Sequence, residues 1–407
     1  MSNVAPASAA ADASVAVVGA GIVGACIAYM LRKRGAQVAL IDRDEPGHGA
    51  SFGNSGALSP GSVAPLAMPG VLAAVPGMLT DPQGALYLPP AYLPRALPWL
   101  ARFVAAARPD RVARIAGSLA ALHAGAIDRH LALAAEVGAA ELIVRRGHLH
   151  LYPDAAALDK DRAAWRLREE HGIAFERLGR AGIDALEPAV SARYTVGMFL
   201  PDHATVLDPH QYVRRIVDAF VAAGGELARD RVAAIEPAGA DGWRVRGEAA
   251  TRTVQHAVIA AGAWSKPLLD ALGIRVPLET QRGYHVSFTG VRSPVSRTVV
   301  LADRKAFVAP RLDGLRIGGT VEFGGLDRAP DFRRADTLAR FATETFEGLD
   351  AAERRVWMGH RPCLPDTLPR VGPAPGRPGL WLAFGHGHLG LTDAANTAGL
   401  LADVMLP

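Results

Sequence analysis

The chain has 407 residues, of which half are hydrophobic and 21% are charged. This length allows two domains or one large interleaved unit, and the composition excludes an intrinsically disordered chain. The formal net charge is only +4, from 44 basic and 40 acidic residues. Because binding to nucleic acid needs concentrated positive charge, this balance gives no indication of such a partner.

The two cysteines, Cys26 and Cys363, indicate no disulfide and fit a reducing, cytoplasmic compartment. Residues 1–13 are rich in alanine and serine and lack the basic and apolar regions of a signal peptide, so we expect a flexible tail. No segment reaches the ~18 uncharged apolar residues that a membrane-spanning helix needs. The sequence therefore predicts a cytoplasmic protein.

The first ordered segment combines a strand, a glycine turn and a helix. Apolar residues 15–18 precede Gly19-x-Gly21-x-x-Gly24, and an apolar helical run follows. Gly19 allows the tight turn, Gly21 lets the backbone approach a pyrophosphate, and Gly24 lets the helix pack closely on the strand. The helix start, which includes Ile22 and Val23, offers N–H groups to the phosphates. We therefore predict a dinucleotide site at this turn.

A second strand, residues 37–41, ends at Asp42 and Arg43. Asp42 follows Gly24 at the spacing at which an acid accepts a hydrogen bond from a ribose hydroxyl. An acid at this position serves NAD or FAD equally well, so the choice of dinucleotide needs other evidence.

Two further segments favour FAD. The loop HGASFGNSGALSPG at 48–61, with Ser51, Asn54 and Ser55, consists of small residues, as expected where backbone lies close to a ligand. Near the C-terminus, glycines 385, 387 and 390 precede a helical stretch from about 392 to 404. A second helix N-terminus stabilises the negative charge of a reduced flavin. The contacts expected there are Gly387, His388, Leu389, Gly390, Leu391 and Thr392.

The segment that follows is punctuated by prolines between 60 and 98, and we expect a long loop region there. Helical spacing of apolar residues predicts helices within 93–107 and 112–137. The alternating RRGHLHLYPD segment predicts a strand, and a charged helix is expected from about 155 to 170.

Two strands in the second half of the chain are predicted to join the sheet of the first unit. Asp208 and Pro209 are typical of a helix start, and two glycines at 224 and 225 end that helix. The apolar strand at 256–261 is typical of a buried parallel strand, and the last strand, 380–384, is expected in the same sheet. Strong alternation across 277–322 predicts an antiparallel sheet in a second domain, followed by a helix near 337–345.

Four segments resemble the D-amino-acid oxidase superfamily of FAD-dependent oxidoreductases, and within it bacterial D-amino-acid dehydrogenases, including D-hydroxyproline dehydrogenase-like members. They are SFGNSGALSPGSVAPLAMPG at 51–70, QRGYHV at 281–286, GHRPCLPDTLPRVGP at 359–373 and GHGHLGLT at 385–392. The resemblance covers essentially the whole chain.

The resemblance implies an α/β fold with a discontinuous Rossmann-like FAD-binding domain and an inserted substrate domain. We expect the FAD-binding domain at 14–60, 195–275 and 356–407. The substrate domain, an antiparallel sheet with helices, is expected at 61–194 and 276–355.

The resemblance also implies roles for single residues. Arg361 matches the arginine that holds the substrate carboxylate, a role that suits a planar guanidinium with two parallel donors. The alternative is a local ion pair between Arg361 and Asp366. Tyr284 matches a tyrosine that is expected to face the substrate; the alternative is a core tyrosine at a strand start.

Phe307 stands where the glycine-oxidase branch has a tyrosine, which leaves an apolar wall. His388 either touches the substrate or the flavin edge or is simply packed, and its spacing from His386 is not that of a metal site. Val232 is expected beside the adenine, and Ala261 and Gly262 beside the pyrophosphate.

Cys363 raises the question of a covalent flavin, because sarcosine-oxidase relatives tether FAD through a cysteine in this segment. Counted back from Asp366, that position falls on Gly359, so we expect non-covalent FAD.

The resemblance implies hydride transfer from Cα of a D-amino acid to flavin N5, which gives an imino acid and then a 2-oxo acid. D-proline and cis-4-hydroxy-D-proline are plausible substrates beside an apolar wall, and a broad D-alanine-type dehydrogenase is the main competitor. The electron acceptor is a quinone, another respiratory carrier or, for an oxidase, oxygen. The same resemblance leaves open a secondary-amine oxidase, a tRNA-modifying flavoprotein and a silent FAD-binding scaffold.

The helix at 93–107 bears on where the protein resides. It carries Trp99 and Phe103 together with Arg95, Arg102 and Arg108, so it could lie on the inner membrane surface. An amphipathic helix packed on its own domain is the other interpretation.

Overall fold

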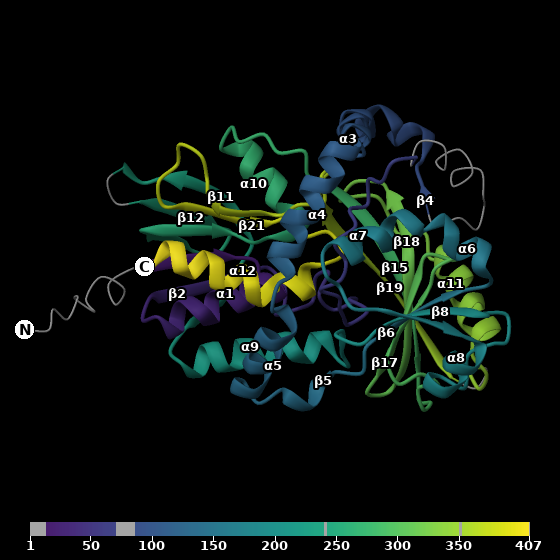
Figure 1. The fold of residues 1–407 in the computed structure, drawn as a ribbon. Helices are drawn as coiled ribbons and strands as arrows, with labels where there is room; N and C mark the ends of the chain where they lie inside the picture. The colour runs from purple at the N-terminus through teal and green to yellow at the C-terminus, as the bar shows by residue number, and fades with distance from the viewer. Residues whose placement is uncertain (1–13, 71–85, 240–241, 350–351, 407) are drawn as a thin grey trace, which may run out of the picture.

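The computed structural model describes residues 14–70, 86–239, 242–349 and 352–406. Two large sheets lie side by side, one with helices along it and one forming the other half of the molecule (Figure 1). The expected tail at 1–13 lies outside the described residues. No helix within the described ranges is long and apolar enough to cross a bilayer.

The first sheet collects strands from the beginning, middle and end of the chain. Its order among the described strands is β10-β2-β1-β14-β21-β20, and only β20 runs antiparallel to its neighbour. The bounds are β1 Ser14–Val18, β2 Gln37–Asp42, β10 Glu226–Arg229, β14 His256–Ile259, β20 Arg370–Pro373 and β21 Leu380–Phe384. The apolar strands β14 and β21 pair in parallel beside β1, which confirms the expected return of the chain to this sheet.

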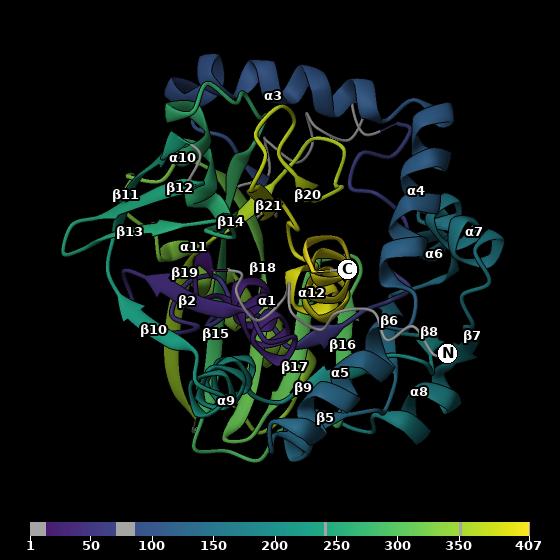
Figure 2. The same ribbon diagram turned by 90° about the vertical axis from the view of Figure 1, so that its left-hand side faces the viewer.

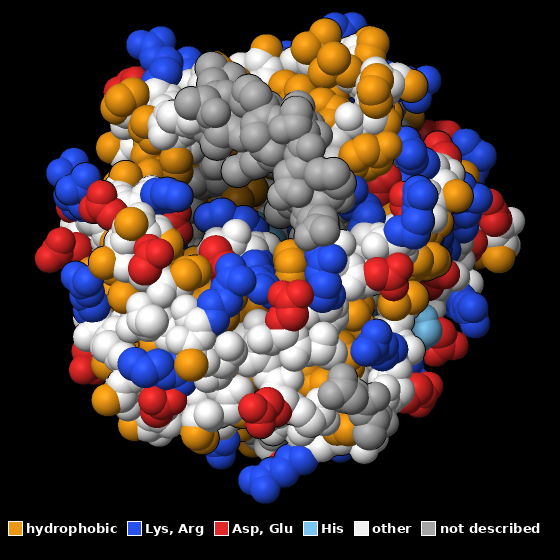
Figure 3. Space-filling view, turned by 90° about the vertical axis from the view of Figure 1, so that its right-hand side faces the viewer, with side chains coloured by type: hydrophobic (Ala, Val, Ile, Leu, Met, Phe, Trp, Pro, Cys, Tyr) orange, Lys and Arg blue, Asp and Glu red, His pale blue; other side chains and the backbone are white. Residues whose placement is uncertain are grey.

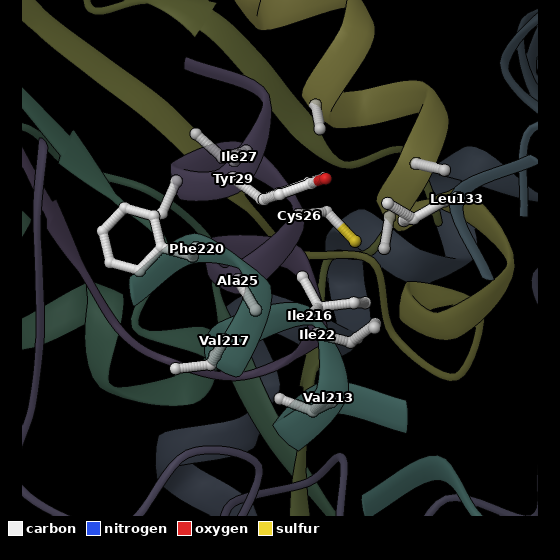
Figure 4. Close-up of a cluster of buried hydrophobic side chains, with 14 of the residues drawn as sticks. Ile22, Ala25, Cys26, Ile27, Tyr29, Leu133, Val213, Ile216, Val217 and Phe220 are labelled. Carbon is white, nitrogen blue, oxygen red and sulfur yellow. The ribbon is translucent and has the colours of Figure 1, made fainter. Parts of the chain in front are cut away.

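One face of this sheet is covered by four helices: α1 Ile22–Lys33, α5 Ala126–Glu136, α9 Pro209–Ala222 and α12 Gly390–Met405. Figure 4 shows the apolar side of α1 meeting Val213, Ile216, Val217 and Phe220 of α9. The other face packs against the antiparallel strands β11 Val232–Pro237, β12 Trp243–Gly247 and β13 Thr251–Val254, and against α10 Ser265–Ala271. The central strands are therefore buried on both sides.

The second sheet is larger and mostly antiparallel. Its order among the described residues is β19-β15-β18-β17-β16-β6-β8-β7, with β4 paired to β18. The bounds are β4 Leu86–Tyr87, β6 His148–Tyr152, β7 Glu176–Gly179, β8 Val196–Leu200, β15 Glu279–Thr289, β16 Thr298–Leu301, β17 Ala306–Arg311, β18 Gly314–Phe323 and β19 Glu353–Cys363. Helices α8 Arg180–Leu186 and α11 Arg333–Thr345 cover its outer face.

The inner face of the second sheet holds the loop that follows β2. Arg316 Nη1 donates to the carbonyls of Phe52 and Asn54 at 2.9 and 2.8 Å, and Nδ1 of His285 lies 3.0 Å from the carbonyl of Gly53. These bonds tie the two halves together at the loop that the sequence places beside the ligand.

Several expected boundaries differ from the structure. Strand β8, Val196–Leu200, lies inside the segment 195–275 that was expected in the FAD-binding domain, and β19 spans the boundary expected at 356, yet both pair within the second sheet. Helices α4 Pro109–His123 and α5 pack on α12, so part of 61–194 lies against the first unit. The helix expected at 155–170 is two helices, α6 Ala155–Lys160 and α7 Arg162–Glu170.

The remaining described elements are short or flank the two sheets. The proline-rich segment contains η1 Pro90–Tyr92 and α3 Leu93–Ala106, whose bounds agree with the expected helix. The others are β3 Ala57–Leu58, η2 Ala140–Leu142, β5 Ile143–Val144, β9 Ala204–Val206 and η4 Gly262–Trp264.

Asp208 both starts α9 and anchors the second sheet. Its Oδ1 accepts from the N–H of Gln211 at 3.0 Å, as expected for an N-cap, and lies 3.1 Å from Nη2 of the buried Arg311. Asp208→Ala should lower the free energy of unfolding by ~2–4 kcal/mol, because it removes the cap and leaves a buried guanidinium without its carboxylate. Asp208→Asn keeps a cap and should cost less. Urea unfolding checks this, and an alanine variant as stable as the parent protein would contradict it.

Candidate functional site

A pocket opens where the carboxyl ends of β1, β2 and β14 meet the inner side of the second sheet. Its volume of about 540 Å³ lies within the ~300–1,000 Å³ typical of ligand sites. Most of the residues predicted to bind the dinucleotide line it: Gly19, Gly21, Ile22, Val23, Asp42, Arg43, Ser51, Asn54, Val232, Ala261, Gly262, Gly387, Gly390 and Leu391.

The glycine turn has the geometry that its sequence predicts. Gly19 has a φ of +111°, and its N–H donates to the carbonyl of Ile41 at 2.8 Å. A Cβ on Gly24 would collide with the carbonyl oxygen of Gly19, so only glycine allows α1 to approach the turn so closely. The N–H of Ile22 donates to Ser51 Oγ at 2.9 Å, which joins the turn to the small-residue loop.

The end of β2 forms the second part of the pocket. Asp42 accepts the N–H groups of Ala20 at 2.6 Å and of Asp44 at 3.0 Å. Burial raises the pKa of Asp42, although these N–H groups and Arg43 act in the opposite direction. Each carboxylate oxygen keeps a further lone pair that can accept from a ribose hydroxyl.

Two aromatic rings that line this end of the pocket were not predicted. The guanidinium of Arg43 stacks over the ring of Trp264 at 4.0 Å, and Trp264 meets His360 edge to face at 5.1 Å. Burial, with the charges of Arg282 and Arg43, lowers the pKa of His360 to about 4, so this ring is neutral at pH 7. The tryptophan directly after the glycine turn at 262 was a signal that could have identified part of this wall.

Two helix N-termini point into the pocket. Helices α1 and α12 pack along each other (Figure 2). The first residues of both helices line the pocket. The first turn of α1 has no acidic residue. The one acid in the first turn of α12, Asp393, is buried and accepts from Nδ1 of His123 at 2.7 Å. The positive ends of both helices thus remain available to phosphates or to an anionic ring edge.

Five predicted cofactor residues do not line this pocket: Gly24, Ser55, His388, Leu389 and Thr392. Gly24 acts through helix packing, as described above. Thr392 is buried, and its Oγ1 accepts from the N–H of Ser59 at 3.0 Å, so it ties α12 to the small-residue loop.

Arg361 lies on β19, on the face of the second sheet that points toward the first unit. Its Nη1 donates to the carbonyl of Thr320 at 2.9 Å and its Nη2 to that of Gly319 at 3.4 Å. A Cβ on Gly283 would collide with the guanidinium, which therefore lies directly over this glycine. Arg361 is half-buried, desolvation lowers the pKa of its guanidinium, and no carboxylate pairs with it in the described part of the chain.

The carbonyl that holds Arg361 belongs to a strained residue. Thr320 has a φ of +63° within β18, next to a register shift between β15 and β18. A non-glycine residue in this conformation costs ~1–2 kcal/mol. The strain turns the Thr320 carbonyl toward the guanidinium, so Arg361 is oriented at the expense of local backbone stability.

The alternative pairing of Arg361 with Asp366 is absent among the described contacts. Asp366 instead lies 2.8 Å from Nη2 of Arg370 and accepts from the N–H of Leu368. Asp366 is therefore a structural residue of the loop between β19 and β20.

Phe307 and His388 lie on Arg361's side of the sheet. Phe307 pairs with Gly318, which pairs with His285, and His285 shares a face with Gly283 and Arg361 by strand alternation. His388 is exposed, yet desolvation and the charge of Arg361 lower its pKa to about 4. The ring is therefore neutral at pH 7.

The expectation that Tyr284 faces the substrate is wrong for this structure. Tyr284 is 1% exposed on the opposite face of β15, where it packs beneath α11. Its hydroxyl donates to Glu322 at 2.5 Å and accepts from the N–H of Asp331 at 2.9 Å. The alternation of β15 puts Gly283 and His285 on the inner face and leaves Tyr284 in the core.

Cys363 is buried, and burial raises the pKa of its thiol to about 12, so it is not a thiolate. A Cβ on Gly359 would collide with the ring of Trp357. A side chain at position 359 would therefore require the ring of Trp357 to move. Among the described residues, no group of three or more histidine, cysteine or acidic side chains is arranged to hold a metal.

A glycine turn, an acid at the end of β2 and two helix N-termini surround one pocket, an arrangement typical of a dinucleotide-dependent enzyme. The family model for FAD dependent oxidoreductases matches residues 14–404. The chain belongs to this family and is an FAD-dependent oxidoreductase.

Named relatives span nearly the whole chain. A D-amino-acid oxidase of Bradyrhizobium diazoefficiens is 38% identical over 398 residues, which are 96% of this chain and 94% of that protein. D-amino acid dehydrogenase 2 of Ralstonia nicotianae is 37% identical and covers 96% of each chain. The structure of glycine oxidase from Geobacillus kaustophilus has a TM-score of 0.74 at 22% identity, covering 96% of this chain and 94% of that one, which supports the fold alone.

Buried histidines around the site predict how stability depends on pH. Burial lowers the pKa of His130, His148 and His386 to about 4, from 6.5 in an unfolded chain. Below pH 6.5, folding therefore requires these histidines to release protons. Their contribution to the free energy of unfolding is complete above pH 6.5 and is lost as the pH falls towards 4. We expect the free energy of unfolding to decrease by at least ~1 kcal/mol per pH unit between pH 6 and 4.5. Urea unfolding across this range would contradict the prediction if the midpoint did not move.

Proposed function

We propose that the protein oxidises a D-amino acid to its imino acid, with Arg361 binding the substrate carboxylate. The observation that carries the proposal is the guanidinium of Arg361, which is desolvated and has no carboxylate partner among the described residues. A buried cation without a counter-charge is costly unless a ligand supplies one. A substrate carboxylate supplies that charge and can accept two parallel N–H bonds.

FAD, when bound, supplies the acceptor for a hydride. The residues of the chain then have to hold the substrate with its Cα–H in one direction. Arg361 fixes the carboxylate, and the two carbonyls behind it limit how the guanidinium can rotate. Phe307, on the same face, offers an apolar surface to the side chain of the substrate.

The neutral histidines define the proton chemistry of the proposal. With a pKa of about 4, His388 does not carry a positive charge at pH 7 and so does not repel an incoming amine. The same low pKa makes it a weak proton acceptor. We infer that the substrate amine is neutral when Cα is oxidised. Hydrolysis of an acyclic imine then gives a 2-oxo acid and ammonia, whereas a cyclic imine can persist.

The names of the relatives support D-amino acids as the substrate class, and they do not agree on the electron acceptor. One is named an oxidase and the other a dehydrogenase, and both names specify D-amino acids. We propose a dehydrogenase that passes electrons to a quinone or another respiratory carrier, with oxygen as the alternative acceptor. The apolar surface of Phe307 supports D-proline or cis-4-hydroxy-D-proline as substrates. The blocked position at Gly359 supports non-covalent FAD.

We further propose a cytoplasmic protein that touches the membrane through α3. Leu93 and Leu97 are 40% and 53% exposed on this helix, beside Arg95 and Arg102. Exposed leucines next to arginines are the features that bind a helix to an anionic lipid surface.

The function is tested by following the flavin absorption of the purified protein without oxygen. We expect D-amino acids, with D-proline and cis-4-hydroxy-D-proline among them, to bleach the absorption, and L-amino acids to leave it unchanged. The rate at which colour returns in air then distinguishes an oxidase from a dehydrogenase. A yellow protein that no amino acid bleaches would overturn the proposal.

Arg361→Ala should lower kcat/KM for a D-amino acid by ~10- to 150-fold, which corresponds to the ~1.5–3 kcal/mol of a hydrogen bond to a charged group. Arg361→Lys restores the charge without the two parallel donors and should recover only part of the loss. Steady-state kinetics on the FAD-loaded variants checks this. A silent FAD-binding scaffold predicts no difference between the variants.

Gly283→Ala tests the orientation of Arg361 without removing it. The new methyl group collides with the guanidinium, so Arg361 has to leave its two carbonyls. We expect a higher KM with bound FAD and thermal stability close to those of the parent protein. Gly318→Ala is the matched control, because a Cβ there meets its nearest neighbour at an ordinary 3.6 Å. Equal KM values for the two variants would show that Arg361 does not need this position.

A further inference from the structure

The excess positive charge of the chain is concentrated on one segment. Residues 86–127 contain five arginines, no lysine and a single acid, Asp110. Subtracting these from the totals of 44 and 40 leaves 39 basic and 39 acidic residues in the rest of the chain. Elsewhere the two signs are interspersed, as on the face shown in Figure 3. The formal net charge of +4 therefore equals the charge of the segment that forms α3, α4 and the turn between them, where Arg108 lies.

These two helices border a second pocket, which we call the arginine pocket. It has a volume of about 420 Å³ and lies between α3, α4 and the loop that joins β19 to β20. Four arginines line it, together with one acid, Asp366, and an apolar surface that includes Ile115 and Leu368. The arginines are Arg102, Arg111, Arg114 and Arg370. It shares no lining residue with the dinucleotide pocket.

The positive charge of the arginine pocket is only partly neutralised. Arg102 donates to the carbonyl of Pro98, and neither Arg102 nor Arg111 has a carboxylate partner in the described part of the chain. Arg114 is 74% exposed and lies 3.4 Å from Asp110, a distance and exposure at which an ion pair contributes little. Only Arg370 has a close partner, Asp366 at 2.8 Å.

The arrangement is complementary to an anion that also has an apolar part. Guanidinium groups bind the paired oxygens of a phosphate or carboxylate through parallel N–H bonds. The apolar surface beside them can remove a short hydrocarbon segment from water. Inorganic phosphate can bind only to the guanidinium groups, and a neutral alcohol can bind only to the apolar surface.

We propose that the arginine pocket binds an amphiphilic anion, through a phosphate or carboxylate group on its arginines and an apolar segment on Ile115 and Leu368. The ligand is either a soluble metabolite or a lipid headgroup with the start of its chain, because both present this chemistry. The site is separate from the flavin and from Arg361, so it does not depend on the oxidation proposed above.

The probe is hexyl phosphate, titrated calorimetrically into the FAD-loaded protein at pH 7.5 and low salt, with inorganic phosphate and hexanol for comparison. We expect hexyl phosphate to bind at least 10-fold more tightly than inorganic phosphate, and hexanol not to bind. The double variant Arg111→Gln/Arg114→Gln should weaken binding at least 10-fold. Arg166→Gln, an exposed arginine on α7 that faces Glu170, is the matched control and should bind like the parent protein.

A second arm separates the two sources of ligand. Vesicles of phosphatidylglycerol are compared with vesicles of phosphatidylcholine by co-sedimentation. Binding of hexyl phosphate that is lost in the double variant supports a soluble ligand. Binding to anionic vesicles alone, also lost in that variant, supports a lipid headgroup.

Binding of neither probe, or binding that the double variant retains, would overturn the proposal. Both substituted arginines are exposed, so the variants should keep their flavin absorption and melting temperature. If the double variant does not fold, the single variants replace it, and each should weaken binding on its own.

Discussion

The desolvated guanidinium of Arg361 is the feature around which the neighbouring strands of the second sheet are arranged. It is held by two backbone carbonyls and has no carboxylate partner among the described residues, so its positive charge is available to a ligand. Desolvating such a charge costs free energy, and the neighbouring strands adapt their backbone to accommodate it. Thr320 adopts a left-handed conformation to present its carbonyl, and position 283 lacks a side chain so that the guanidinium fits.

The first half of the molecule uses backbone dipoles in place of a side-chain charge. Two helices that begin on the pocket wall, α1 and α12, come from opposite ends of the chain and pack along each other. The loop at 48–61 lies between the halves, tied to α1 through Ser51 and to α12 through Thr392. Arg316 binds the carbonyls of the same loop from the second sheet. One small-residue segment thus sets the distance between the flavin-binding elements and the sheet that carries Arg361.

Sequence reasoning succeeded where the chemistry is local. The turn at Gly19 and Gly24, the acid at the end of β2 and the cap at Asp208 depend on contacts within a few residues or on one standard unit of structure. Trp264 was missed because an aromatic residue after a turn is equally compatible with a core position. Its role on the wall depends on Arg43 and His360, which come from distant segments.

The sequence by itself determined the dinucleotide-type strand–turn–helix unit and the FAD-dependent class. Motifs in these places encode short-range geometry, which does not change with the rest of the fold. Only the tertiary structure decided which face of a strand each side chain occupies, because a strand alternates at every residue and the burial of each face depends on distant partners. That alternation moved Tyr284 into the core and kept Gly283 beneath Arg361. The tertiary structure also placed three arginines of α3 and α4, Arg102, Arg111 and Arg114, around one pocket, since a balanced total charge says nothing about where the charges lie.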